Sequence, residues 1–342
     1  DNGIFVRHIT DGWVTRPTFQ RVVIEDSMYR GVLVEQYNHS QFSNLPANAV
    51  FEDLTIRGTG GVNAKTSGLA FSAFEVNTSG VIVDNALIED NPVVGFKGYL
   101  IGSSTIINGL EINNNGKPLT NTPINDRAGL FLRSVNWAPI INDLVVTNST
   151  GPGILLWKGG AMGQDWWTSD NGASGADFRE FHPQVTILRS LDNAGHGVSV
   201  RDSSNVELSH VLTSGNGIGS SLPETGAGLY FHEANDVMSG GKNVSCFTCI
   251  SNGDQYGIVA RDSIDLQLLA VEVHDPLSGP ALDIDNSGLS RDGLVIIDDM
   301  RINLNQSNYA IQLQDVNAEI HGLDLSGDNG GVFWSAGDSI TS

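Results

Sequence analysis

The chain has 342 residues, of which 18 are Lys or Arg and 39 are Asp or Glu, so its formal net charge is −21. A surface this acidic repels phosphate backbones, which argues against nucleic acid as a partner. No apolar run approaches the roughly 20 residues of a membrane-spanning helix. The first residues, "DNGIFVRHIT", lack the basic and apolar regions of a secretion signal. We therefore expect a piece of a longer extracellular protein, or a mature product whose leader has been removed.

One short pattern recurs along the chain. It reads apolar, any, apolar, any, any, apolar, and ends near Asn, Gly or Asp, as in "VIVDNALIEDN" at 81–91 and "VIIDDMRIN" at 295–303. A second element follows each copy and consists of Gly or Ala and then alternating apolar residues, as in "GVLVEQ" and "GLYFHE". Alternation predicts strands with one buried face. Asn and Gly are suited to the positive-φ corners between such strands.

The spacing of these copies predicts the fold. The second apolar position of each falls at Phe19, Phe51, Val83, Ile107, Ile141, Ile187, Leu208, Cys246, Leu268, Ile297 and Ile320. Short steps of 21 to 24 residues between them fit one turn of a right-handed parallel β-helix, an all-β solenoid of about 11–12 coils. A leucine-rich repeat would need a fixed Leu and Asn ladder, which the sequence pattern does not show. We predict one β-helix domain over residues 1–342.

Two of the longer steps predict loops inserted into the solenoid, at 157–184 and 215–227. The first contains three tryptophans, Trp157, Trp166 and Trp167, among Gly and polar residues. Sugar rings and protein partners both contact exposed aromatic side chains, so these three are candidate ligand-binding residues. The alternative is that they pack against the flank of the solenoid as a small satellite core. The second loop, "GNGIGSSLPETGA", is polar and leads directly into the strand "GLYFHE".

The strands that begin with Gly place polar side chains in two outward columns. Aligning them puts Tyr230 in one column and Arg201, His232 and Arg261 in the other, with Glu233 at the following bend. Neighbours in a column are expected about 5 Å apart. The guanidinium groups would then lower the pKa of the Tyr230 phenol. Such a face could neutralise a uronate carboxylate while Tyr or His moves a proton, so the four column residues are candidate catalytic residues and Glu233 a candidate ligand-binding residue. The alternative is that these polar side chains simply cover a strand face that is exposed to solvent.

Residues 227–233, "AGLYFHE", resemble the Tyr-Gly-Phe-Asp-Pro-His-Glu motif of the mannuronan C5-epimerases. Three motif positions are matched, at Gly228, His232 and Glu233, whereas Ala227 replaces the motif Tyr and Tyr230 replaces the motif Asp. The repeat itself resembles the wider parallel β-helix superfamily, which includes pectate and alginate lyases, epimerases, phage tailspikes, adhesins and surface-layer-like proteins. This resemblance implies the fold and leaves enzymes and inert scaffolds as alternatives.

The two cysteines, Cys246 and Cys249, stand in a Cys-x-x-Cys arrangement. The repeat places both on the interior face, so we expect two small core residues, with a disulfide as the main alternative. No second Cys or His pair stands at zinc-site spacing. We predict no specific metal site, although aspartates at the bends, such as Asp262 and Asp285, could hold Ca²⁺.

Five Asn-x-Ser/Thr sequons are candidate glycosylation sites, at Asn38, Asn77, Asn148, Asn243 and Asn305. Two functions fit these features. The first is an extracellular structural or adhesive segment of a cell-surface, filament or surface-layer protein that binds glycans and associates with itself, or with adjoining domains, through open helix ends. The second is a polysaccharide lyase or C5-epimerase acting on a uronate polymer. We favour the first because the epimerase motif is incomplete.

Overall fold

The computed structural model describes residues 3–8, 16–36, 49–60, 72–78, 80–99, 101–116, 127–135, 138–234, 244–263, 265–287, 294–304, 310–327, 331–334 and 339–341. They belong to two compact units, Asp1–Gly172 and Ala173–Ser342. Each unit is built from parallel coils. The prediction of one domain over 1–342 stays a prediction.

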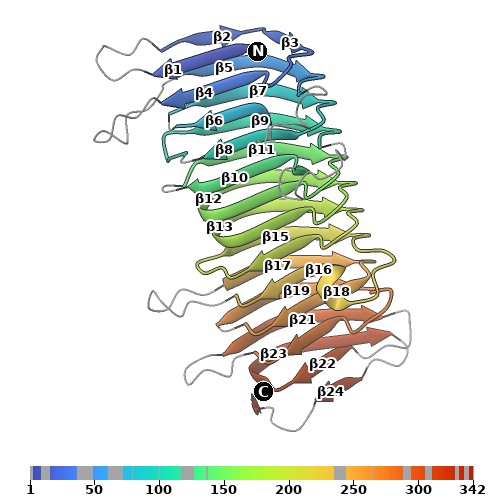
Figure 1. The fold of residues 1–342 in the computed structure, drawn as a ribbon. Coiled ribbons are helices and arrows are strands. Elements are labelled where there is room, and N and C mark those ends of the chain that lie inside the picture. The colour runs from blue at the N-terminus through green and yellow to red at the C-terminus, as the bar shows by residue number, and fades with distance from the viewer. Residues whose placement is uncertain are drawn as a thin grey trace. The chain divides into compact units, whose positions relative to one another are not determined.

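Unit 1 contains two ladders of strands. Ladder A contains the strands β1 (Ile4–His8), β4 (Val32–Gln36), β6 (Ser72–Asn77), β8 (Val94–Tyr99), β10 (Leu130–Val135) and the first part of β12 (Ile154–Ser169). Ladder B contains β2 (Thr18–Gln20), β3 (Val23–Glu25), β5 (Val50–Arg57), β7 (Ile82–Glu89), β9 (Ile106–Asn113), β11 (Ile140–Thr147) and the rest of β12. Every pairing joins a strand to its counterpart in a neighbouring coil, and all are parallel (Figure 1).

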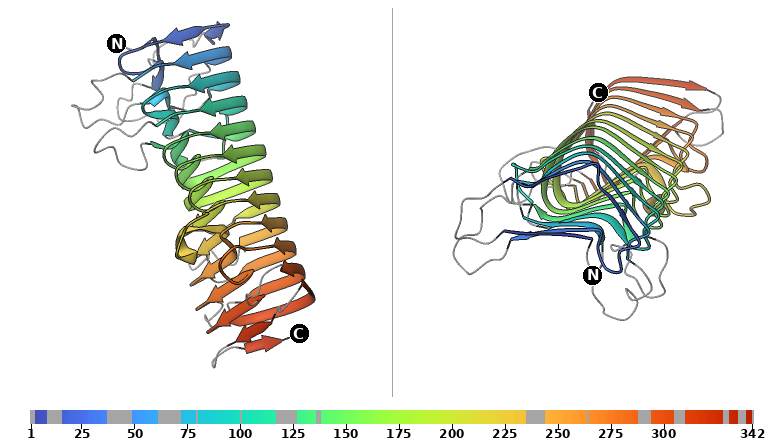
Figure 2. Two further views of the ribbon diagram at one scale, coloured as in Figure 1. Left: turned by 90° about the vertical axis from the view of Figure 1, so that its right-hand side faces the viewer. Right: turned by 90° about the horizontal axis from the view of Figure 1, so that it is seen from above.

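Unit 2 repeats the same plan. Its ladder A runs from the first part of β13 (Ala176–Leu191) through β14 (Val198–Arg201), β16 (Ala227–His232), β18 (Tyr256–Arg261), β20 (Leu282–Asp285) and β22 (Ile311–Gln314) to β24 (Val332–Trp334). Its ladder B contains the rest of β13, β15 (Glu207–Ser214), β17 (Val244–Asn252), β19 (Leu266–His274), β21 (Val295–Leu304), β23 (Asn317–Gly327) and β25 (Ser339–Thr341). Within the unit, successive coils lie over one another (Figure 2). The predicted parallel β-helix is confirmed in each unit.

The predicted core positions stack in register inside the coils. Phe51 pairs with Val83 in unit 1, and Leu268 pairs with Ile297 in unit 2. All four side chains are fully buried. Because the same position of every coil points inward, each coil buries apolar surface against the next, and this burial is the main stabilising force of the stack.

Residues 157–184 are not an inserted loop, contrary to prediction. They continue β12 and form much of β13, with a bend at 170–175. The core position of the coil is Gly163, which pairs with Ile141. The buried indole of Trp166 fills the space beside Gly163 and donates a 2.8 Å hydrogen bond from Nε1 to the carbonyl oxygen of Ile141. The apolar pattern skipped this coil because a glycine stands where the other coils carry an apolar side chain.

The predicted register is also wrong at Ile187. Leu208 pairs with Val185 instead, and Ile187 lies at a corner with φ of 64°. A β-branched residue is unusual in this left-handed region, where Asp, Asn and Gly are favoured. The corresponding corner in neighbouring coils is occupied by His210 and Thr248, both with positive φ. The step of one coil is therefore 23 residues here, from Val185 to Leu208, rather than 21.

Buried polar ladders line one interior bend of each unit. In unit 2 the Asn216 side chain accepts hydrogen bonds from the backbone N–H and the side-chain amide of Asn193. Asn216 in turn donates to the buried carboxylate of Asp254. Asn91 and Asn115 form the equivalent contact in unit 1. These side chains satisfy bend amides that no strand partner can reach. An Asn ladder is thus present, so its apparent absence from the sequence was not a valid argument against a leucine-rich repeat.

Both cysteines are fully buried, as predicted, and they form the disulfide that was the alternative, Cys246–Cys249. Two of the candidate glycosylation sites can be placed. Asn148 is exposed at a bend, whereas the Asn77 side chain donates to Glu75 at the end of β6. The other three, at positions 38, 243 and 305, lie outside the described residues. No helix among the residues that the structure places could cross a bilayer.

Candidate functional site

The predicted columns form on ladder A of unit 2. Arg201 pairs with His232, and His232 pairs with Arg261. In the adjacent column Tyr230 lies between Ser199 and Val259. The four candidate catalytic residues are therefore neighbours on three successive strands, β14, β16 and β18.

The strand next to Arg201 carries Arg179, whereas the alignment of the sequence repeats places Trp157 there. Arg179 in β13 pairs with Arg201, and Asp177 pairs with Ser199. The sequence "GADFRE" carries the Gly-initiated alternation of this strand, but it lies within the loop predicted over residues 157–184. Arg179 binds the nearly buried Asp177 carboxylate, with 2.5 Å between Nη2 and Oδ2.

Tyr230 is buried rather than facing water, because only 4% of the residue is exposed. Its ring stacks on the His196 ring, with centroids 4.4 Å apart and planes 7° apart, and on the His232 ring at 6.1 Å. The Arg201 guanidinium lies 5.2 Å from the centre of the Tyr230 ring. Burial raises the pKa of the phenol, and this outweighs the opposing effect of Arg201. The predicted lowering of the Tyr230 pKa is therefore wrong, and the phenol is protonated at neutral pH.

His196 is the residue of this face that sequence reasoning missed. Its Nδ1 accepts the backbone N–H of Ala227 at 3.0 Å, and its Nε2 lies 2.9 Å from the carbonyl oxygen of Glu224. Because Nδ1 accepts, the proton is on Nε2 and the ring is neutral. Burial, with the charge of Arg201 second, lowers the pKa of His196 to about 4. It precedes Gly197 at the start of a strand, a position to which the alternation assigns no role.

A loop covers part of the columns. Residues 215–226 connect β15 to β16 and contain the short 3-10 helix η3 (Pro223–Thr225), which packs against β16 and β18 (Figure 1). The predicted polar loop is therefore present, and it lies over the strand face that the alternation predicts to be exposed. Glu224 of η3 approaches Arg261, with 3.3 Å between Oε1 and Nε. Arg261 also binds Asp283, with 2.6 Å between Nη2 and Oδ2.

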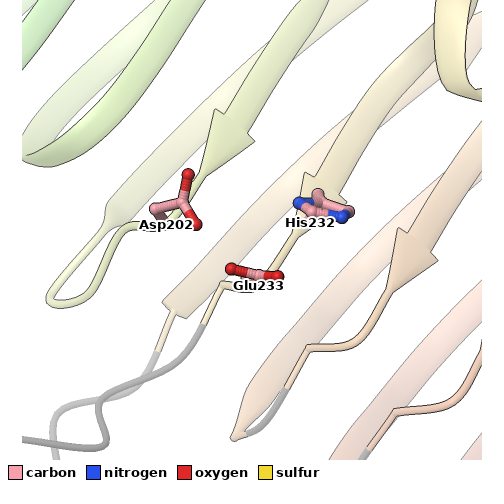
Figure 3. A group of neighbouring side chains, drawn as sticks. All are labelled: Asp202, His232 and Glu233. Atoms are coloured by element: carbon pink, nitrogen blue, oxygen red, sulfur yellow. The ribbon is translucent and has the colours of Figure 1, made fainter.

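Three potential metal ligands gather where β14 and β16 end. Asp202, His232 and Glu233 each offer one donor atom, and these atoms all lie within 4.8 Å of one another (Figure 3). A hydrogen bond to Asp202 and the negative charge of that residue raise the pKa of Glu233. An imidazole with two carboxylates is a donor set that divalent cations accept. Both acidic residues also occupy positive-φ corners, where polar side chains follow from the fold.

The three candidate tryptophans do not form one surface. Trp166 is in the core, as described above. Trp157 lies on ladder A of unit 1, where the Arg133 guanidinium covers its ring at 4.4 Å. Trp167 is 37% exposed on ladder B, paired with Val145. The satellite-core alternative fits Trp157, which packs on a buried outer cluster that includes Phe131.

Comparison with known proteins supports the fold. No family model matches the chain, and no curated protein matches it either. Among solved structures, the A-module of a mannuronan C-5 epimerase from Azotobacter vinelandii is similar, with a TM-score of 0.51 and 13% identity over 86% of this chain and 91% of that one. A glycoside hydrolase matches at a TM-score of 0.33 and 9% identity, over 92% of this chain and 50% of that one.

The chain has a right-handed parallel β-helix fold, as predicted. At 13% identity the likeness concerns the fold, which enzymes and scaffolds share. What the chain does must be argued from the contacts on ladder A.

Proposed function

We propose that the chain is an extracellular structural or adhesive β-helix that binds acidic polysaccharide on ladder A of unit 2. The observation that carries the proposal is a row of three arginines and a histidine on one strand face, in a chain of net charge −21. Arg179, Arg201, His232 and Arg261 are successive register neighbours. The first three side chains are each about one-third exposed, at 34%, 33% and 35%. Arginines at this spacing can hydrogen-bond carboxylates along an extended acidic chain.

The contacts of two of the four catalytic candidates, Tyr230 and Arg261, favour binding over chemistry. A phenol that is buried and protonated cannot accept a proton from a sugar. Arg261 already neutralises Asp283 and Glu224, so its charge is shared with groups of the chain itself. Arg201 is 3.9 Å from its own carboxylate partner, Asp177, and is one-third exposed, so its guanidinium can still meet an external carboxylate.

Two features support an extracellular location. The Cys246–Cys249 disulfide is of a kind that persists in oxidising compartments and is rare in a reducing cytosol. The sequon at Asn148 is exposed, so a glycan at this position would project into solvent. Self-association through the terminal coils stays a prediction, and electron microscopy of the purified chain for filaments or lattices is its test.

The binding site is tested by charge removal. Arg201→Gln is expected to raise the dissociation constant for oligogalacturonate or oligomannuronate about tenfold, because it deletes one charge-assisted contact. Isothermal titration calorimetry at low and moderate salt would measure this. Arg301→Gln is the matched control, since Arg301 is 60% exposed on ladder B of the same unit. Equal loss of affinity in both variants would show that attraction is unspecific and would contradict the site.

A polysaccharide lyase or C5-epimerase is the second candidate. The motif residues Gly228, His232 and Glu233 lie on β16 and its following bend, and the epimerase A-module shares the fold. For Tyr230 to take part in this chemistry the loop that covers it would have to move, whereas His232 is already partly exposed. Turnover of a uronate polymer that is abolished in His232→Ala would establish it.

A further inference from the structure

The geometry points to a carboxylate-binding position on Arg261 that the chain's own Glu224 occupies, so that an acidic ligand must displace the 215–226 loop to bind there. The inference rests on the proposed function, because it names the group that competes with the polysaccharide. This position lies beside η3, which packs against β16 and β18.

The donors of Arg261 are divided between fixed and replaceable partners. Nη1 donates to the carbonyl oxygens of Ala260 and Asp283, and Nη2 donates to the Asp283 carboxylate. Only Nε is directed to the loop, at Glu224. The Asp283 side chain is 7% exposed, whereas that of Glu224 is 43% exposed. Asp283 therefore holds the guanidinium in place, and the Glu224 carboxylate occupies the position that an external carboxylate would take.

The base of the 215–226 loop is held more firmly than its tip. At the base, a Cβ on Gly217 would lie 2.3 Å from Gly226, so the two ends of the loop are pressed together. Backbone hydrogen bonds hold this base to neighbouring coils, from Gly217 to Asn193 and from Tyr256 to Gly226. We therefore expect the base of the loop to stay in place when the tip moves.

The tip is held by a few side-chain contacts. Gly219 donates to the Gln255 side chain at 3.0 Å, and Glu224 contacts His196 and Arg261 as described. Ile218 and Leu222 of the tip are 63% and 55% exposed, so they bury little apolar surface when the loop is closed. A ligand carboxylate on Arg261 would replace the ion pair of the Glu224 side chain, so the tip would be held only by the backbone contact of Glu224 with His196, by Gly219 and by the packing of η3.

The ligand that fits is a polymer with a carboxylate on successive sugars. Arg201 stands one strand before His232, and Arg261 one strand after it. A polyuronate lying along the ladder could place one carboxylate at Arg201 and another at Arg261. A neutral polysaccharide has no carboxylate to offer Arg261, so we do not expect it to displace the loop.

The test compares Glu224→Gln with the wild-type protein. We expect the variant to bind oligogalacturonate about fivefold more tightly, the effect of removing one partly exposed competing ion pair. Carboxyl-reduced oligogalacturonate of the same length should show no such gain. Glu207→Gln, which removes an exposed carboxylate from ladder B of the same unit, controls for the change in net charge.

Hydrogen exchange provides a readout that does not depend on affinity. Oligogalacturonate should accelerate exchange at amides 218–225 of the wild-type protein while those of β16 stay protected. Binding by both proteins without a gain in Glu224→Gln, or without loop opening, would overturn this inference and leave the proposed function standing. Absence of oligogalacturonate and oligomannuronate binding in both proteins would overturn both.

Discussion

Replacing Asp254 with Ala is expected to lower the free energy of unfolding of unit 2 by about 4 kcal/mol. The carboxylate is fully buried, and Oδ1 accepts from the backbone and side-chain N–H groups of Asn216. Oδ2 accepts from the hydroxyls of Thr213 and Ser251, both at 2.7 Å. Alanine would leave the backbone N–H of Asn216 and the hydroxyl of Ser251 without this acceptor, whereas Asn216 Nδ2 keeps the Ser190 carbonyl oxygen and Thr213 the Ile250 carbonyl oxygen at 3.4 Å.

Asp254→Asn is the matched control for this loss. It keeps one acceptor oxygen for Asn216, and the hydroxyls of Thr213 and Ser251 can rotate to accept from its amide group. We expect a smaller loss of stability than in the alanine variant. Urea unfolding followed by circular dichroism would measure both. A loss below about 1 kcal/mol in Asp254→Ala would show that the polar ladder does not stabilise the coils.

The stability of unit 2 should fall between neutral pH and about pH 4 because of His196. Its pKa in the folded protein is about 4, below the usual 6.5. As the pH drops below 6.5 the unfolded chain takes up this proton and the folded chain does not, so the contribution is complete above 6.5 and is lost towards pH 4. The full difference corresponds to about 3 kcal/mol.

Other groups titrate over the same range, so the effect of His196 must be isolated. His196→Asn can keep an acceptor for the backbone N–H of Ala227 and does not titrate. Denaturant unfolding at pH 7 and pH 4.5 should show a smaller loss in this variant than in the wild-type protein. Equal losses would mean that the buried imidazole contributes nothing to the pH dependence.

The sequence predicted the fold well because the fold depends on a repeated local pattern. Alternating apolar residues and Asn or Gly corners identified both ladders, and the columns around His232 followed from register alone. The pattern missed the coil in which a side chain from a different position fills the core. Gly163 lacks a side chain, and the indole of Trp166, three residues later, fills its place. A search that requires an apolar residue at each core position cannot find such a coil.

The candidate site was predicted less completely because the residues that cover it lie outside the strand pattern. Alternation shows that Tyr230 points away from the coil interior, but not that the 215–226 loop and His196 bury it. The resemblance at Gly228 has a structural explanation as well. A Cβ there would lie 2.3 Å from the Asp254 carboxylate, so a glycine is required whether or not the chain is an enzyme. That match therefore carries little weight for function.

Exchange at C5 tests the central claim most directly. The protein would be incubated in heavy water with oligomannuronate and oligogalacturonate at concentrations that saturate binding. Deuterium at C5 would be followed by nuclear magnetic resonance, and unsaturated sugars by their ultraviolet absorbance. Because Tyr230 is buried and protonated, we expect the ligand to bind and to remain chemically unchanged. Deuterium incorporation or unsaturated product that disappears in His232→Ala would contradict it and identify the chain as an epimerase or a lyase.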